Sequence, residues 1–471
     1  MVTSPSVSAP AAETTDHGLL RVIGLWPAVM LVVGNVIGSA IFLTPGAIAE
    51  ALPSVPLVLA AWLAGGLLAC AGGLTFAEMG TMFPRSGGLY TYLAEAFGPF
   101  VAFLCGWAMV LVVLPGGVAA VAVAFAESFS YFAPALGTDR ILLTVPWPAG
   151  EWPISAGQIV AVVFILASTA VNLFGVGTAS LISAGITVLK IAAVAAIPLV
   201  AVVVWPQTPA LVPVAAPVPR PWAAFGVAMV AVMWAFEGWS YLAFAAGEVK
   251  RPERTLPRAL VFGSLGLTVL YVLANAGYFI ALPLEAIAGE DRVAEKAMRA
   301  LVGPAGATVV AATVCVSTLG CNLAGILTMS RAGFAMAVDG LFFRFAARVH
   351  PVWRTPHGAL VGLGVWSSVL ALSGSYEQLF TYATFAAVLF NLLGGFAIFR
   401  LRRTHAGVPR PYRAWGYPVV PLLFILGSLV LVANTLVERP FESIAGLGLV
   451  LLGAGPYCFW QRRRASAASH V

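Results

Sequence analysis

Two ionisable side chains lie inside long apolar stretches of the sequence, where charge is costly. Lys190 lies 12 residues after Thr178, and Glu237 lies 15 residues after Trp222. If a helix starts at Thr178, it rises about 18 Å before it reaches Lys190. The lysine side chain would then be too far from either membrane surface to reach water easily. A buried carboxylate is usually neutralised or paired. Glu237 could therefore carry a proton, recognise an amine or hydrogen-bond a neighbouring helix.

Two clusters of helix-weakening residues lie in the same sequence. The first is Gly34-Asn-Val-Ile-Gly-Ser-Ala-Ile-Phe42, followed by Pro45, and the second is Trp234-Ala-Phe-Glu-Gly-Trp-Ser-Tyr241. Unwound backbone in an apolar medium is tolerated where it lines a cavity or holds a ligand. Either cluster alone could instead serve close packing of helices. Two interruptions at matching positions favour a binding site.

The composition identifies the surrounding medium. The chain has 471 residues, of which 60% are apolar and 9% charged, and its mean hydropathy is +0.95. Soluble domains carry about 25% charged residues, so soluble enzymes, nucleic-acid binders and disulfide scaffolds are excluded as leading interpretations. The net charge of +6 is attributed to membrane topology. The cysteines are scattered without a CxxC pair, which predicts packing roles and no metal or cofactor.

Apolar windows predict an all-α integral membrane protein with twelve spans. The break at 172–178 divides one long window, and 222–245 is accepted despite Glu237. The predicted helices are 26–50, 56–82, 93–124, 154–173, 178–205, 222–245, 257–281, 304–330, 357–372, 377–400, 417–436 and 442–461.

The loop charges predict the orientation of these spans. With the N-terminus inside, the cytoplasmic segments hold 18 Lys and Arg and the outer segments hold six. This bias places both termini in the cytoplasm of a multi-pass protein of the cell membrane.

The two clusters fall in the first and sixth spans, which indicates two five-helix repeats of opposite topology. The predicted organisation is a disordered tail at 1–20, repeats at 21–205 and 222–401, two further helices within 417–461 and a cytoplasmic tail at 462–471.

Four collinear motifs resemble those of amino acid–polyamine–organocation (APC) transporters, most closely the L-type amino-acid transporter branch. The first cluster resembles the signature Gly-x-Ile-Ile-Gly-Ser-Gly-Ile-Phe in the first span of that superfamily. Residues 78–90 resemble the end of the second span and its loop, and 247–257 resemble the loop after span six. Residues 330–340 and 350–356 resemble the eighth span and its loop, so the similarity covers nearly all of 22–460.

The resemblance implies a LeuT-like fold with alternating access around interrupted helices one and six. It places the carboxylate of a substrate on backbone N–H groups, where a half-helix begins and its dipole favours an anion. These groups belong to Gly38, Ser39 and Ala40. It places the amine on carbonyls of Val36, Trp234, Ala235 and Glu237, with Trp234 also closing over the substrate. Tyr241 and Asn391 match side chains that line the same cavity.

The resemblance also implies that Lys190 bridges spans one and eight in place of Na⁺. The alternative is a structural tether from Lys190 to carbonyls of span one. Two departures from the family pattern matter. Ala40 stands where the family has Gly, which trims the pocket or the freedom of its backbone. Glu237 stands where many relatives have a small residue, and it could favour a cationic substrate or a proton.

The resulting prediction is a sodium-independent secondary transporter of amino acids that works by exchange or proton coupling. Neutral amino acids are the first choice, and a cationic amino acid or polyamine recognised by Glu237 is the alternative. A membrane-embedded enzyme would need a catalytic cluster within the spans, and the sequence shows none. A substrate-sensing receptor would need a long signalling domain, which the sequence does not show either. The expected partners are the substrate, membrane lipid and a proton. Animal L-type transporters, which the chain resembles, pair with a partner subunit by a disulfide from a Cys in the loop between spans three and four. Residues 127–153 contain no Cys, so the resemblance implies no disulfide-linked partner subunit.

Overall fold

The computed structural model describes residues 18–52, 54–147, 150–204, 221–373, 376–438 and 440–468, and most of them are helical. In this part of the chain, nine helical segments are long and apolar enough to cross a membrane. The prediction of a helical multi-pass membrane protein is confirmed. Of the two predicted tails, residues 1–17 and 469–471 lie outside the described residues, and the second tail is helical up to Ala468.

The first half of the chain begins with a segmented helix and ends with two long ones. Its helices are α1 (Leu25–Val36), α2 (Ala40–Leu43), α3 (Pro45–Ala51), α4 (Val55–Met82), α5 (Leu89–Phe97), α6 (Pro99–Ala108), the π-helix η1 (Met109–Val113), α7 (Leu114–Phe129), the 3-10 turn η2 (Pro134–Leu136), α8 (Ala156–Leu173) and α9 (Val176–Val204).

The second half repeats the pattern of a segmented helix followed by long ones. Its helices are α10 (Pro221–Phe236), the 3-10 helix η3 (Tyr241–Glu248), α11 (Pro252–Ala281), α12 (Leu284–Ile287), α13 (Val293–Val302), α14 (Pro304–Val338), the 3-10 turn η4 (Arg344–Ala347), α15 (His357–Ser373), α16 (Tyr376–Thr404), α17 (Val419–Glu438), α18 (Pro440–Leu452) and α19 (Ala454–Ala468).

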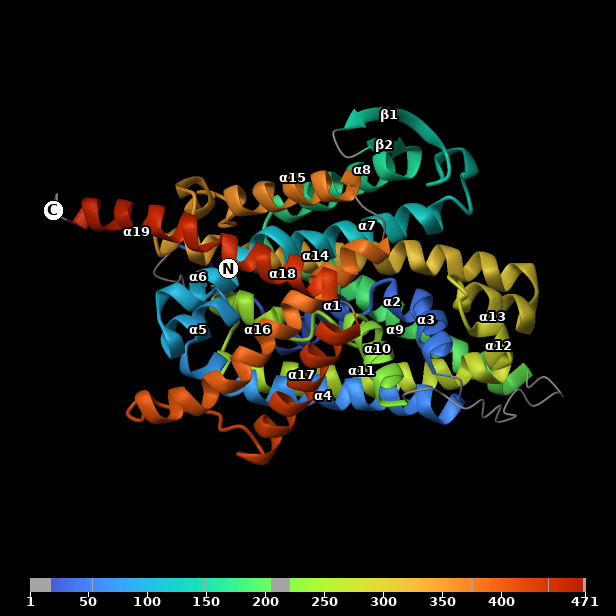
Figure 1. Cartoon of the computed structure of the whole chain (residues 1–471), viewed down its shortest axis with the longest axis horizontal. Coiled ribbons are helices and arrows are strands. Elements are labelled where there is room, and N and C mark those ends of the chain that lie inside the picture. The colour runs from blue at the N-terminus through green and yellow to red at the C-terminus, as the bar shows by residue number, and fades with distance from the viewer. Residues whose placement is uncertain are drawn as a thin grey trace, which may run out of the picture.

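The long helices follow the long axis of the molecule (Figure 1). The short helices α12 and α13 and the β hairpin lie at one end, and α5 and α19 lie at the other. α1 packs against α9, α11 and α14, and α4 packs along α11. The first interrupted helix is therefore enclosed by three long helices.

The connection before α8 contains a short β hairpin that the sequence did not predict. Strands β1 (Ile141–Trp147) and β2 (Gly150–Ser155) pair antiparallel, with Thr144 opposite Pro153. The Ser155 side chain then caps α8 by accepting from the Gln158 N–H at 3.2 Å, while Gln158 accepts from the Ser155 N–H at 2.8 Å. This reciprocal capping fixes where the strand ends and the helix starts.

Other boundaries also differ from the predictions. The helix expected at 93–124 is divided between α5 and α6, because Gly98 adopts φ +88° immediately before Pro99. From α6 the chain stays helical through the π-helix η1 into α7. The last expected helix, 442–461, is divided into α18 and α19. Residues 284–302 were expected to connect two spans, but they form α12 and α13. Val293, Ala297 and the residues beside them bury one face of α13, which a hydropathy window does not detect.

The outer surface of α13 is tied to the chain that precedes it. The Lys296 ammonium donates to the Glu290 carboxylate at 2.9 Å, and this hydrogen bond lowers the pKa of Glu290. The backbone at Glu290 lies against Gly46 of α3, where an added Cβ would meet the Glu290 carbonyl oxygen. The Gly289 N–H donates to the Gly46 carbonyl at 3.1 Å. These contacts attach α12 and α13 to the segment that continues the first interrupted helix.

Glycines let the central helices approach closely. In α4, a Cβ added at Gly72 would lie 2.5 Å from the Trp239 ring and 2.7 Å from the Phe424 ring. Small residues at helix interfaces are a general device of membrane proteins, since they allow backbones to come near. The ring of Trp239, which belongs to the second interruption, is thus seated directly on α4.

We expect Gly72→Val to destabilise the protein by about 1–3 kcal/mol, the usual cost of overpacking. The measurement is the midpoint of thermal unfolding of the full chain in detergent. Gly266→Val is the matched control, because Gly266 is also inside a long helix but an added Cβ meets no atom of the described residues within 4 Å. Equal midpoints for the two variants would contradict the close packing of α4 on Trp239.

Candidate functional site

The first interruption lies in the buried middle of the bundle. α1 ends at Val36 and α2 begins at Ala40, and between them the Gly38 N–H donates to the Val36 carbonyl at 2.8 Å. Residues 30–42 are all buried. The predicted break in this helix is therefore present, and it leaves both a helix end and a helix start away from water. Such ends carry backbone groups with no partner inside their own helix.

Lys190 of α9 brings a positive charge to this interruption. Its ammonium donates to the carbonyls of Gly34 at 3.0 Å and Ile37 at 2.6 Å, and the residue is 1% exposed. Gly320 of α14 leaves room for the lysine stem, since an added Cβ would lie 2.7 Å from the lysine Cε. A buried charge is stable only when hydrogen bonds replace its lost hydration. The two carbonyls provide that replacement.

Side chains that the sequence analysis did not select occupy other carbonyls of the interruption. In each case a side-chain hydroxyl or thiol donates to a backbone carbonyl: Tyr271 to Val36 (3.1 Å), Tyr278 to Ile41 (3.2 Å), Ser317 to Gly38 (2.9 Å) and Cys321 to Asn35 (3.1 Å). The tyrosines are seven residues apart on α11, and Ser317 and Cys321 are four apart on α14, so each pair shares a helix face. Polar residues spaced by four or seven along an apolar helix are the sequence signal that could have identified these four side chains as partners of the interruption.

The second interruption lies directly against the first. α10 ends at Phe236, a turn follows, and η3 starts at Tyr241. Gly238 in this turn has φ +108°, and an added Cβ would lie 3.0 Å from the Asn35 backbone carbon. A side chain there would be strained by the backbone angle and blocked by the neighbouring chain. Glycine at 238 is therefore what allows the two interruptions to touch.

Glu237 is the acidic group of the second interruption. Its carboxylate is hydrogen-bonded by the Tyr241 hydroxyl and by the Gly238 backbone N–H. The residue is partly exposed, yet its Oε2 is buried and has no hydrogen-bond partner among the described residues. An unpaired buried carboxylate oxygen is costly, so this atom has an unused capacity to accept a hydrogen bond.

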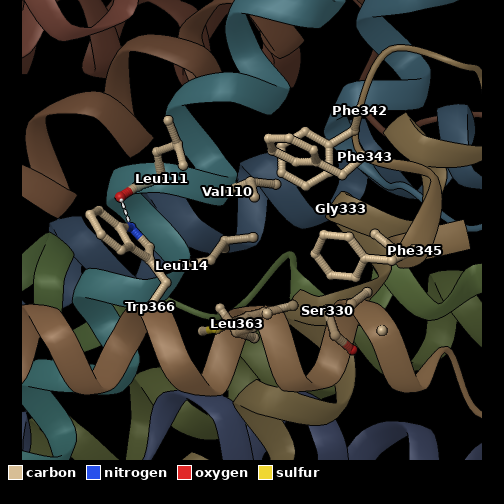
Figure 2. Close-up of a pocket in the computed structure, with 15 residues that line it drawn as sticks. Val110, Leu111, Leu114, Ser330, Gly333, Phe342, Phe343, Phe345, Leu363 and Trp366 are labelled. Atoms are coloured by element: carbon tan, nitrogen blue, oxygen red, sulfur yellow. Dashed lines mark hydrogen bonds between the residues drawn. The ribbon is translucent and has the colours of Figure 1, made fainter.

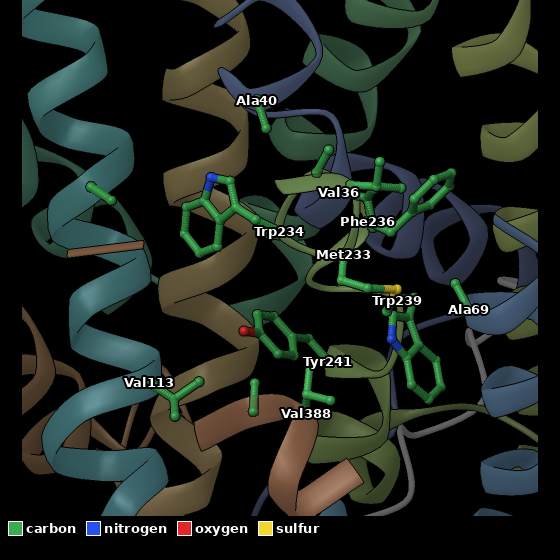
Figure 3. Close-up of a cluster of buried hydrophobic side chains, with 14 of the residues drawn as sticks. Val36, Ala40, Ala69, Val113, Met233, Trp234, Phe236, Trp239, Tyr241 and Val388 are labelled. Carbon is green, nitrogen blue, oxygen red and sulfur yellow. The ribbon is translucent and has the colours of Figure 1, made fainter. Parts of the chain in front are cut away.

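Two aromatic side chains extend from the two ends of this interruption. Figure 3 shows Trp234 and Tyr241 pointing in the same direction, toward α7 and α14, with Ala40 beyond the indole ring. The Trp234 ring comes near α7 at Gly117, where an added Cβ would lie 4.0 Å from it. The rings thus lie on the side of the interruptions that faces α7 and α14.

The structure brings most of the predicted site residues to one place. Those at the first interruption are Val36, Gly38, Ser39 and Ala40, and those at the second are Trp234, Ala235, Glu237 and Tyr241. Asn391 comes from α16, where it is buried one turn after Val388. Figure 3 shows Val388 close to Tyr241, and both belong to one buried cluster. α16 therefore contributes to the same region from a separate helix.

A buried ion pair fixes the far end of the second interruption. The Arg331 guanidinium of α14 donates to the Glu248 carboxylate at 2.7 and 3.1 Å, and both side chains are fully buried. Arg331 also donates to the Leu327 carbonyl and to the Ser330 hydroxyl. The Glu248 carbonyl accepts from the N–H groups of Val22 and Ile23, both at 3.0 Å. η3, α14 and the segment before α1 are thereby joined.

A multi-pass helical protein with two interrupted helices in contact at its centre has the architecture of a secondary transporter. The sequence profile of the amino acid permease family matches residues 23–446. The chain belongs to this family, as the APC resemblance of its motifs implied.

Several characterised transporters are similar over most of their length. The serine/threonine exchanger SteT of Bacillus subtilis is 31% identical over 96% of this chain and 100% of its own. The mouse b(0,+)-type amino acid transporter 1 is 29% identical over 92% of this chain and 86% of its own. The human cystine/glutamate transporter is 28% identical over 93% of this chain and 85% of its own.

We expect Gly238→Ala to destabilise the protein by about 2 kcal/mol or more, because it adds backbone strain and pushes against Asn35. Thermal unfolding of the purified chain in detergent measures this. Gly185→Ala in α9 is the control, since an added Cβ there meets no atom of the described part of the chain within 4 Å. An unfolding midpoint for Gly238→Ala as high as that of the control would show that the interruptions are not in close contact.

Proposed function

We propose that the protein is a sodium-independent secondary transporter that moves amino acids across the cell membrane by exchange or proton coupling. The observation that supports this most directly is the pair of interrupted helices, with Lys190 bound to the carbonyls of the first. The family and the relatives support the same proposal, because the relatives are amino acid transporters by name. Membership of a permease family makes the protein a transporter and not an enzyme.

The full architecture proposed is a LeuT-like arrangement of twelve spans with two inverted repeats, 21–205 and 222–401. The segmented helices α1–α2 and α10–η3 support this, since each opens a run of long helices. The excess of Lys and Arg on one set of loops supports cytoplasmic termini.

The substrate zwitterion is proposed to lie between the two interruptions. Its carboxylate would accept from N–H groups at the start of α2, around Gly38, Ser39 and Ala40, where the helix dipole favours an anion. Its amine would donate to carbonyls near Val36 and at Trp234, Ala235 and Glu237. The Val36 carbonyl already accepts from Gly38 and Tyr271, so Ala235 and Glu237 are the better-placed acceptors.

Lys190 is proposed to take the role that a sodium ion has in related transporters. Its ammonium is a cation held by two carbonyls at the first interruption. A covalently attached charge cannot leave with the substrate, so the protein would need no Na⁺ to form its site. The alternative is that Lys190 is a structural tether without a role in coupling. Both interpretations use the same hydrogen bonds, and they differ in whether transport requires the positive charge.

A site made from backbone groups binds the part that all amino acids share, and neutral amino acids are proposed as the preferred substrates because a protonated Glu237, or one turned from the pocket, would offer no charge to a cation. The alternative is a cationic amino acid or polyamine, and the unpaired Oε2 of Glu237 favours it. A proton on the same carboxylate would remove that preference. Proton coupling and cation recognition are therefore competing uses of one side chain.

Purified protein in liposomes is expected to take up a labelled amino acid without Na⁺, faster when the vesicles are preloaded with amino acid. Lys190→Met should reduce the rate by about tenfold to hundredfold, the value of charged hydrogen bonds. Lys250→Met is the control, because Lys250 is exposed. Failure of every amino acid and amine to move would refute the proposal, and full activity of a folded Lys190→Met variant would reduce Lys190 to a tether.

Glu237→Gln separates the two substrate classes. Glutamine keeps a hydrogen-bond acceptor for Tyr241 but has no charge, so exchange of a neutral amino acid should stay within about threefold of the original rate. The measurement compares counterflow of neutral and cationic substrates in preloaded liposomes. A loss confined to cationic substrates would support the alternative substrate class, whereas loss of all exchange by folded protein would show that neutral substrates also need the carboxylate.

A further inference from the structure

An apolar pocket lies apart from the two interruptions, between η1, α14, η4 and α15. Its volume is about 160 Å³. Figure 2 shows Val110, Leu111 and Leu114 on one side, Leu363 and Trp366 on another, and the phenylalanines of the loop after α14 closing the third.

The polar groups at this pocket already have partners. Pro115 has no N–H to give to the Leu111 carbonyl, four residues earlier, and the Trp366 indole N–H donates to that carbonyl at 2.8 Å instead. The Ser330 hydroxyl donates to the Leu327 carbonyl at 3.2 Å and accepts from Arg331 at 2.9 Å. Because these groups are satisfied, the pocket is suited to hydrocarbon rather than to a polar molecule.

Glycines and exposed rings shape the pocket. Gly333 and Gly362 line it, and Cβ atoms added to them would come no nearer than 3.8 Å to Val110 and 3.5 Å to Phe345. Phe343, Phe345 and Trp366 are 53%, 45% and 39% exposed while also lining the pocket. The pocket is therefore open to the outside of the bundle, where a lipid chain can enter.

Two arginines lie next to the phenylalanines of the pocket (Phe342, Phe343 and Phe345) in the sequence. Arg344 lies between Phe343 and Phe345, and Arg348 follows η4; both are exposed. Neither guanidinium has an ion-pair partner within the described ranges. Residues 340–376 contain no Asp or Glu. This loop directly follows a membrane span, which places its charges at headgroup depth.

We propose that this pocket binds one acyl chain of an anionic phospholipid, whose phosphate is held by Arg344 and Arg348. The hydrocarbon would fill the space that Gly333 and Gly362 leave unoccupied, and the two arginines would select a negatively charged headgroup. The bound chain would lie against Ser330, whose hydroxyl contacts the arginine that holds Glu248. The lipid site does not depend on which amino acid the protein carries.

Native mass spectrometry of the full chain with phosphatidylglycerol or phosphatidylcholine of matched chains tests this proposal. The wild-type chain should retain phosphatidylglycerol preferentially. Arg344→Gln with Arg348→Gln should weaken that preference by about fivefold for each arginine removed. Arg403→Gln with Arg413→Gln is the matched control, since it removes the same charge from exposed residues at another loop. Gly362→Phe should reduce retention of both lipids by filling the pocket.

Three results would overturn the proposal. Equal loss of phosphatidylglycerol in the two double-arginine variants would show general attraction to a basic surface. Equal retention of the two lipids by the wild-type chain would show no selection of an anion. Undiminished retention by a folded Gly362→Phe variant, verified by its thermal unfolding midpoint, would place any bound lipid outside the pocket. The arginine variants alter exposed side chains, so they are expected to fold and keep the test decisive.

Discussion

The hydrogen bonds between the Lys190 ammonium and the carbonyls of Gly34 and Ile37 are the interaction on which the rest of the structure depends. An interrupted helix in an apolar interior exposes backbone groups that cost several kcal/mol each if they stay unpaired. The lysine supports carbonyls at the end of α1, and side chains of α11 and α14 support other carbonyls of the interruption. α9, α11 and α14 are thus located by the same backbone defect, and the geometry of the site follows from their positions.

The sequence predicts the interruptions and the two ionisable side chains inside the spans, because Gly, Asn and Ser in an apolar stretch, and Lys190 or Glu237 within one, are local signals. It does not predict which helices supply the partners of the freed carbonyls. Tyr271 and Ser317 resemble ordinary residues of apolar helices until the fold brings them to α1. The β hairpin and α13 are also missed, since short elements outside the spans leave no trace in hydropathy. The roles in binding and coupling of all the predicted site residues stay predictions, namely those of Val36, Gly38, Ser39, Ala40, Lys190, Trp234, Ala235, Glu237, Tyr241 and Asn391.

Small residues are what make a charged interior possible in this bundle. Gly34 admits Thr187, Gly320 admits the stem of Lys190, and Gly238 admits the backbone of Asn35. Each missing Cβ leaves room for a polar side chain or a polar segment of backbone to pack against the neighbouring helix. Close packing of helices and a polar binding site are competing explanations for glycine clusters in a sequence. In this fold the glycines do serve close packing, and the same packing brings the Lys190 ammonium to the carbonyls of Gly34 and Ile37.

Glu248 joins three parts of the molecule through different atoms. Its carbonyl accepts from Val22 and Ile23, its carboxylate accepts from Arg331, and its own chain ends the second interrupted helix. A rearrangement that swings η3 away from α14 must therefore either carry the amino-terminal segment along or release it. Glu248 therefore couples η3, α14 and the amino-terminal segment, so that a movement of one of them is transmitted to the other two.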